Sequence, residues 1–214
     1  MPVDLDALVD PAHAVVVTQE CQRGVLGEDA TFPALAEAAR DRHMLEAISS
    51  LLAAARRAEV PVVHCVVERR PDNRGSNRNA RIFVAAERSP RRLVRGAESA
   101  QLMAGLGPDP TDFVVSRLHG VSPMHDTGLD SLLRNLGCKT IVATGVSLNV
   151  AMVGFAFEAV NRGYQVVMPQ DAVAGVPSEY AEAVLENTIA MVATVPDSSA
   201  VIASWERRAP MGSG

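Results

Sequence analysis

The sequence predicts an α/β protein built on a doubly wound parallel sheet. Five short apolar runs are rich in valine and do not alternate with polar residues, which is typical of strands covered on both faces. Segments with helical periodicity separate these runs, as a parallel sheet requires. We expect the strands at 14–19, 61–67, 112–116, 140–144 and 165–168.

The helical segments follow from spacing and from end signals. In DRHMLEAISSLLAAARRAEVP, apolar residues recur on one stripe from Met44 to Ala55. DTGLDSLLRNLGC starts with Thr127 as a helix cap, and SLNVAMVGFAFEAVNRGYQ starts at Ser147 and stops at Gly163. SEYAEAVLENTIAMVATV predicts a helix followed by a sixth strand near 190–195, and SSAVIASWERR predicts a closing helix.

The stretch 68–111 is long and irregular, and it holds nine arginines between Arg69 and Arg95. We expect short helices near 79–88 and 97–105. The arginines could bind an anionic substrate or a partner subunit, or form a solvated surface with local ion pairs. A nucleic-acid partner is not expected, because the net charge is −5 and no aromatic residues are interleaved to stack bases.

Composition fits one soluble domain. The 214 residues are 48% hydrophobic, and we expect a single domain over 1–214, with a core at about 12–205 and a loose tail at 207–214. No apolar run reaches the roughly 20 residues of a membrane span, and MPVDLDALVDPAH is unlike a signal peptide, so we expect no membrane partner and a cytoplasmic location.

Cysteine and lysine usage limits the chemistry. Three cysteines at wide spacing argue against a disulfide framework, and the lack of CxxC or HxxxH spacing argues against structural zinc. Lys139 is the only lysine, so no other lysine can serve as a base.

In an open parallel sheet, ligands bind beyond the carboxyl ends of the strands. Glu20 ends the first strand, where poor solvation favours a protonated carboxyl group; the alternative is a structural pair with an arginine. Cys21 should point to the opposite face as an inert buried thiol. His64 ends the second strand and could contact a ligand or only a neighbouring carbonyl. The turn at 145–147 opens a helix whose amides could hold an anion, or it is a plain turn.

The chain from about 12 to 205 resembles the isochorismatase-like, or cysteine hydrolase, superfamily. The resemblance rests on AVVVTQECQ, VPVVH, SPMHDTGLDSLLRNLGCKTIVATGVSLNVAM and AVNRGYQVVMPQDAVA, in that order. It implies a Rossmann-like, three-layer α/β/α sandwich with a six-stranded parallel sheet, in homodimers or homotetramers. It also implies a non-proline cis peptide at Val146–Ser147.

The resemblance further implies a degenerate triad, in a branch that lacks the catalytic cysteine. Glu20 stands where the amidase members have an aspartate, and Ala151 stands where they have the nucleophilic cysteine. Arg117 stands near the position of their lysine, with about one residue too many before Ser122. The metal motif of the nicotinamidase branch is unmatched, so we expect no metal and no cofactor.

We therefore expect a metal-independent hydrolase of a small anionic metabolite, with Glu20 as general acid, as the resemblance to isochorismatases implies. Arg117 would hold the substrate, helped by His119 or by an arginine of the 69–81 loop. The other residues expected at the site are His64, Val146, Ser147, Val150 and Ala151. The alternatives are a non-catalytic binding protein on the same scaffold, or a hydrolase with a relocated thiol at Cys21 or Cys65.

The helix after the 145–147 turn carries apolar residues on more than one face, which fits an oligomer. Met152 and Phe155 are among them, and we expect Val153 and Phe157 to pack against the sheet.

Overall fold

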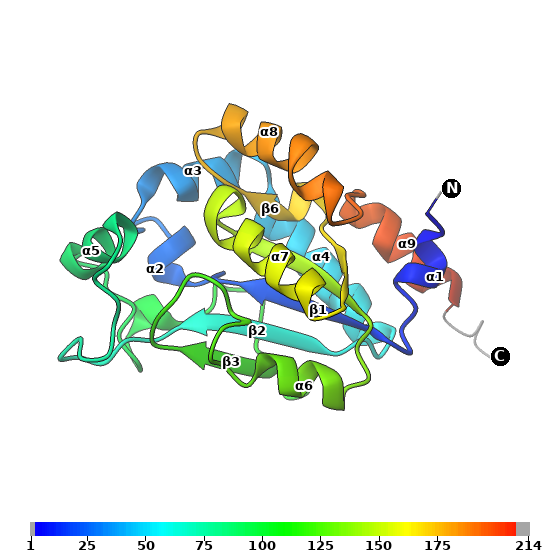
Figure 1. Ribbon diagram of the computed structural model, residues 1–214, viewed down its shortest axis with the longest axis horizontal. Helices are drawn as coiled ribbons and strands as arrows, with labels where there is room; N and C mark the ends of the chain where they lie inside the picture. Colours follow the sequence, from blue (N-terminus) through cyan, green and yellow to red (C-terminus); the bar gives the residue numbers. More distant parts are fainter. Residues whose placement is uncertain (1–2, 209–214) are drawn as a thin grey trace.

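A computed structural model describes residues 3–208, which form a six-stranded parallel sheet between two layers of helices (Figure 1). The strand order is β3-β2-β1-β4-β5, and β6 pairs with the carboxyl end of β4. The strands are β1 (Ala14–Gln19), β2 (Val62–Val67), β3 (Phe113–Arg117), β4 (Thr140–Val146), β5 (Gln165–Val167) and β6 (Val173–Ala174). The predicted doubly wound α/β fold is confirmed.

The helices cover both faces of this sheet. They are α1 (Leu5–Leu8), α2 (Arg23–Leu26), α3 (Pro33–Asp41), α4 (Met44–Arg57), α5 (Arg81–Arg88), α6 (Leu129–Asn135), α7 (Val153–Asn161), α8 (Ser178–Asn187) and α9 (Ser198–Arg208). Short 3₁₀ turns lie at Glu98–Ala100, Gln170–Ala172 and Ile189–Met191, and a π-helical turn lies at Leu148–Met152.

Alternate residues of β1 enter two separate cores, because successive side chains of a strand point to opposite faces. Val16 packs in one core with residues of α4 and α9, which include Leu51 and Trp205. Val17 packs in the other core with residues of α6, α7 and α8, which include Leu133 and Phe155. Two cores on opposite faces of one sheet make the three-layer sandwich that the resemblance implies.

Several expected boundaries are wrong. The sixth strand is not at 190–195, where a 3₁₀ turn lies and Thr194 makes a single bridge to Val167. The actual sixth strand, β6, has two residues, too few to produce a periodic sequence signal. The helix expected near 97–105 is a single turn, whereas the helix expected near 79–88 is confirmed as α5.

Helix ends also differ from the expectation. Helix α6 begins at Leu129, although the Thr127 hydroxyl still accepts the Leu129 amide at 3.1 Å. The expected tail from 207 is partly helical, because α9 runs to Arg208; the rest of it lies outside the described residues. Within residues 3–208, none of the helices has the length and apolar character needed to cross a bilayer.

The apolar surface of α7 departs from the expectation too. Met152 and Phe155 are buried, but Phe157 is 43% exposed and Val153 is half-buried. An oligomer remains a prediction.

Candidate functional site

Glu20 ends β1 at the centre of the sheet, beside the carboxyl ends of β2 and β4. The last residue pairs of β1 join Gln19 to Cys65 and to Gly145. Glu20 itself has a left-handed φ of 54°, and its amide donates to the carbonyl of Cys65 at 2.9 Å. The next residue, Cys21, is fully buried in the core beside α4. The turn thus separates the carboxylate from the thiol, as predicted.

Gly145 permits the close approach of β4 to β1. Its φ is 110°, and a Cβ here would lie 2.2 Å from the carbonyl oxygen of Gln19. The following peptide bond, Val146–Ser147, is cis, which confirms the expectation from the resemblance.

Three amides at the start of the helix after this turn are not free to bind an anion. The amides of Val150, Ala151 and Met152 donate to the carbonyl of Ser147, at 3.2, 2.9 and 3.0 Å. This convergence forms the π-helical turn, and it uses three donors that the sequence suggested could hold an anion.

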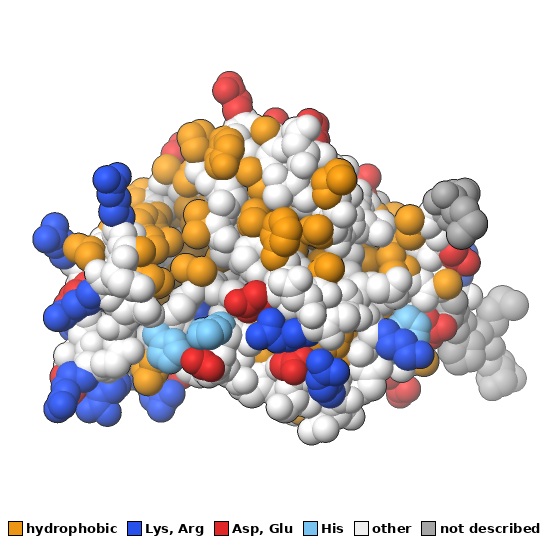
Figure 2. Space-filling view, in the orientation of Figure 1, with side chains coloured by type: hydrophobic (Ala, Val, Ile, Leu, Met, Phe, Trp, Pro, Cys, Tyr) orange, Lys and Arg blue, Asp and Glu red, His pale blue; other side chains and the backbone are white. Residues whose placement is uncertain are grey.

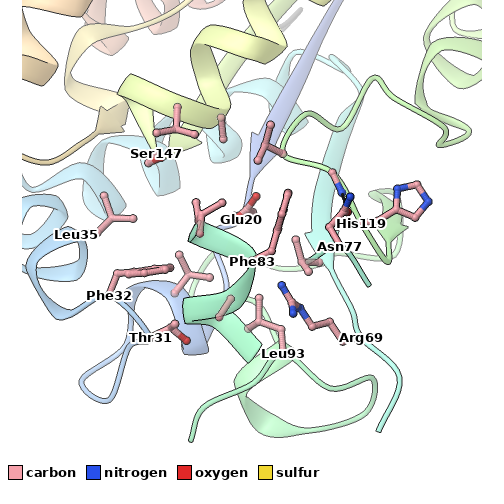
Figure 3. Close-up of a pocket in the computed structure, with 18 of the residues that line it drawn as sticks. Glu20, Thr31, Phe32, Leu35, Arg69, Asn77, Phe83, Leu93, His119 and Ser147 are labelled. Carbon is pink, nitrogen blue, oxygen red and sulfur yellow. Dashed lines mark hydrogen bonds between the residues drawn. The ribbon is translucent and has the colours of Figure 1, made fainter. Parts of the chain in front are cut away.

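A cavity of about 220 Å³ lies beyond the end of β1, next to Glu20 (Figure 3). Loops from both halves of the sheet line it, together with the α5 helix. Of the residues expected at the site, five line the cavity: Glu20, His119, Ser147, Val150 and Ala151.

Glu20 forms an ion pair with Arg117. The Glu20 side chain is 20% exposed, whereas the Arg117 side chain is 2% exposed. Arg117 also donates to the carbonyls of Val121 at 3.2 Å and Gly120 at 3.4 Å. Arg117 therefore lies behind Glu20 and does not line the cavity. The expectation that Arg117 holds the substrate is corrected, because its side chain lies behind Glu20 and does not line the cavity, although its Nη1 is buried without a hydrogen-bond partner.

His64 and Val146 are also not among the residues that line the cavity. Both are fully buried. The His64 ring lies 2.8 Å from the Thr18 hydroxyl at Nδ1 and 3.2 Å from the Asp112 carboxylate at Nε2. Burial lowers the pKa of His64. Both nitrogens of His64 thus have partners inside the protein, a hydroxyl and a carboxylate instead of the neighbouring carbonyl of the second alternative.

Arg69 and Asn77 line the cavity from the segment after β2. Arg69 belongs to the 69–81 loop, from which we expected an arginine at the substrate, whereas the sequence did not single out Asn77. Arg69 is only 7% exposed, and one of its terminal nitrogens, Nη1, is buried without a hydrogen-bond partner. The Asn77 carbonyl oxygen accepts the Gly120 amide at 2.7 Å and ties this segment to the loop after β3. Arg side chains gather on the α5 end of the molecule (Figure 2).

No cysteine supplies a nucleophile to this cavity. All three cysteines belong to the described part of the chain, and none lines the cavity. Burial raises the pKa of Cys21, Cys65 and Cys138 to about 12 each. A thiol needs its thiolate form to attack, so a relocated thiol at Cys21 or Cys65 is excluded.

The residues present do not fit a metal ion. Within 3–208, no three His, Cys, Asp or Glu side chains lie close enough together to ligate one. We derive no catalytic step through a metal.

Two proteins of known name are similar in sequence to part of this chain. Ureidoacrylate amidohydrolase RutB of Methylorubrum extorquens is 32% identical over 126 residues, 57% of this chain and 50% of that protein. The secreted isochorismatase effector Isc1 of Verticillium dahliae is 31% identical over 126 residues, 59% of this chain and 57% of that protein. The match to these curated relatives thus spans about half of their length.

Solved structures agree with this relationship over most of the chain. A cysteine hydrolase from Pseudomonas syringae pv. phaseolicola 1448A superposes with a TM-score of 0.80 at 24% identity, covering 94% of this chain and 95% of that one. An isochorismatase family protein from Desulfovibrio vulgaris superposes with a TM-score of 0.77 at 26% identity, covering 88% and 95%. A family model described as the isochorismatase domain matches residues 14–200. This chain therefore belongs to the isochorismatase family.

Proposed function

We propose that this protein is a hydrolase of a small anionic metabolite, in which Glu20 transfers the proton and no thiol takes part. The observation that carries the proposal is that Glu20 is the single acidic side chain among the residues that line the cavity. A carboxylate that is partly shielded from water, with an arginine behind it, is suited to general acid–base catalysis.

The Glu20 side chain reaches the cavity with Arg117 paired behind it. Glu20 would then take a proton from a bound water as the water oxygen bonds to the substrate carbon. It would return that proton to the leaving group as the scissile bond breaks. This order differs from the expectation from the sequence, in which Glu20 acts first as a general acid and water then completes the hydrolysis.

The absence of a thiol from the cavity supports direct attack by water. Ala151, at the position that the resemblance assigns to the nucleophilic cysteine, lines the cavity with a methyl group and cannot form a covalent intermediate. The relatives support the reaction class: RutB is named as an amidohydrolase, and an N-carbamoylsarcosine amidase from Thermoplasma acidophilum shares the fold with a TM-score of 0.70.

The Glu20–Arg117 ion pair favours a second candidate, a non-catalytic binding protein. If the pair never opens to a substrate, the cavity can hold a ligand without turning it over. Both candidates use the same cavity, so only a measurement of turnover separates them.

The test is a screen by NMR of small carboxylates that each carry an amide, an ester or an enol ether, with the wild-type protein and with Glu20→Gln. The hydrolase proposal predicts that the wild type releases product and that Glu20→Gln binds the same compound without releasing it. Glu98→Gln, a change in a surface ion pair with Arg23, serves as the matched control and should keep full activity. Equal turnover by the wild type and Glu20→Gln would refute the role of Glu20.

A further inference from the structure

The cavity has an apolar body that comes from three separate parts of the chain. Phe32 lies just before α3, Phe83 lies in α5, and Leu93 lies in the loop after α5; all three enter the same space (Figure 3). Other apolar side chains in this lining include Val25, Leu35 and Ile82. Apolar side chains with few polar groups are typical of a site for an organic ligand with an apolar body.

Arg69 is the buried arginine in this lining. It makes no side-chain hydrogen bond and no ion pair with the other described residues, and its Nη1 is buried without a partner. Buried donors almost always have partners, so an unpartnered guanidinium nitrogen beside a cavity calls for a ligand. A guanidinium matches a carboxylate in geometry as well as in charge.

The other arginines nearby are different. Arg70, Arg78 and Arg95 are exposed and pair with acidic residues of the same segment, as Arg91 pairs with Asp29. Of the nine arginines between Arg69 and Arg95, Arg69 is the buried one; Arg92 also lines the cavity but is half-buried.

The charges around Arg69 favour an incoming anion. Burial lowers the pKa of Arg69, and repulsion from Arg92, which also lines the cavity, lowers it further, against the opposing influence of Glu87 and Glu20. Because Arg117 neutralises Glu20, the two arginines at the cavity leave it with an excess of positive charge. An anionic group next to Arg69 would relieve both the burial cost and the repulsion.

The size of the cavity limits the body of the ligand. An apolar protein cavity of about 150 Å³ holds a benzene molecule. The cavity here has about 220 Å³, which leaves room for one ring together with a carboxylate-sized group.

We infer that the substrate of this site is a small arylcarboxylate or a similarly flat cyclic acid, with its ring on Phe32 and Phe83 and its anionic group on Arg69. This assignment rests on the proposed function for the reaction, but not for the binding. In this assignment the anionic group lies on Arg69 instead of Arg117. The scissile bond of the substrate then faces Glu20.

Phenylacetate tests the assignment by direct binding, measured by titration calorimetry or by ligand-observed NMR. We expect phenylacetate to bind the wild-type protein at least about tenfold more tightly than phenylacetamide, which lacks the charge, and than acetate, which lacks the ring. Arg69→Gln should weaken phenylacetate by about tenfold or more and change phenylacetamide by less than about threefold. Arg88→Gln, an exposed arginine at the end of α5 that does not line the cavity, is the control and should bind as the wild type does.

Phenylacetate that binds no better than phenylacetamide or acetate would overturn the assignment, and so would a lack of phenylacetate binding at about 10 mM. If circular dichroism shows that Arg69→Gln does not fold, the ratio of the affinities of the wild-type protein for phenylacetate and phenylacetamide tests the assignment on its own. Glu20→Gln should still bind phenylacetate. Retained binding with unchanged turnover in that variant would therefore overturn the hydrolase proposal and leave the ligand assignment standing.

Discussion

Gly145 offers the sharpest test of how the site is built. A Cβ at this position would lie 2.2 Å from the carbonyl oxygen of Gln19, and the φ of 110° is one that other residues rarely adopt. A left-handed backbone costs a non-glycine residue about 1–2 kcal/mol. Overpacking in a tight interior adds about 1–3 kcal/mol. We therefore expect Gly145→Ala to lower the free energy of unfolding by about 2–5 kcal/mol, a large part of the stability of a typical domain.

The matched control is Gly128→Ala. Gly128 has an ordinary φ of −76°, and no heavy atom lies within 4 Å of the position of its added Cβ. We expect Gly128→Ala to leave the stability within about 1 kcal/mol of the wild type, on the stabilising side. Urea unfolding followed by circular dichroism measures both variants. If Gly145→Ala unfolds within about 0.5 kcal/mol of Gly128→Ala, the close approach of the strands is not as described.

Three further predictions concern buried groups around the site. With the pKa of Cys21 and Cys65 at about 12, roughly one thiol in ten thousand is ionised at pH 8, so iodoacetamide should label them only after unfolding; rapid labelling of the native protein would contradict the burial. Burial lowers the pKa of His64, so the unfolded chain binds more protons as the pH falls below about 6.5, and stability should fall with it; His64→Gln should show a smaller loss of unfolding free energy between pH 7 and pH 5, and an unchanged loss would contradict this. In a double-mutant cycle, Glu20→Gln and Arg117→Gln should show a coupling of about 1–3 kcal/mol in urea unfolding, because the two side chains are ion-paired; additive effects would show that the pair contributes nothing.

Most of the fold could be predicted because long buried strands leave a strong pattern. Strands β1, β2 and β4 are continuous apolar runs, and the predicted starts and ends lie within two residues of the observed ones. Strand β6 could not be found, since its two residues pair only through the position of β4 beside them.

The site was predictable where it depends on the ends of strands, and unpredictable where it depends on side-chain packing. Glu20 and Ser147 follow β1 and β4 directly, and both line the cavity. Arg117 also ends a strand, but its side chain lies behind Glu20. The direction of this side chain could not be predicted from the sequence. Arg69 is one of nine arginines in its segment, and only the folded chain shows that it is the buried one.

The rate of the Glu20→Gln variant, on a substrate that the wild-type protein hydrolyses, tests the central claim most directly. General acid–base catalysis by one positioned group contributes about 10²–10⁴-fold. We predict that kcat/KM falls by at least about 100-fold in Glu20→Gln, that Glu20→Asp recovers part of the loss, and that binding is kept. A kcat/KM within about threefold of the wild type would contradict the account, because the carboxylate at the end of β1 would then have no part in the chemistry.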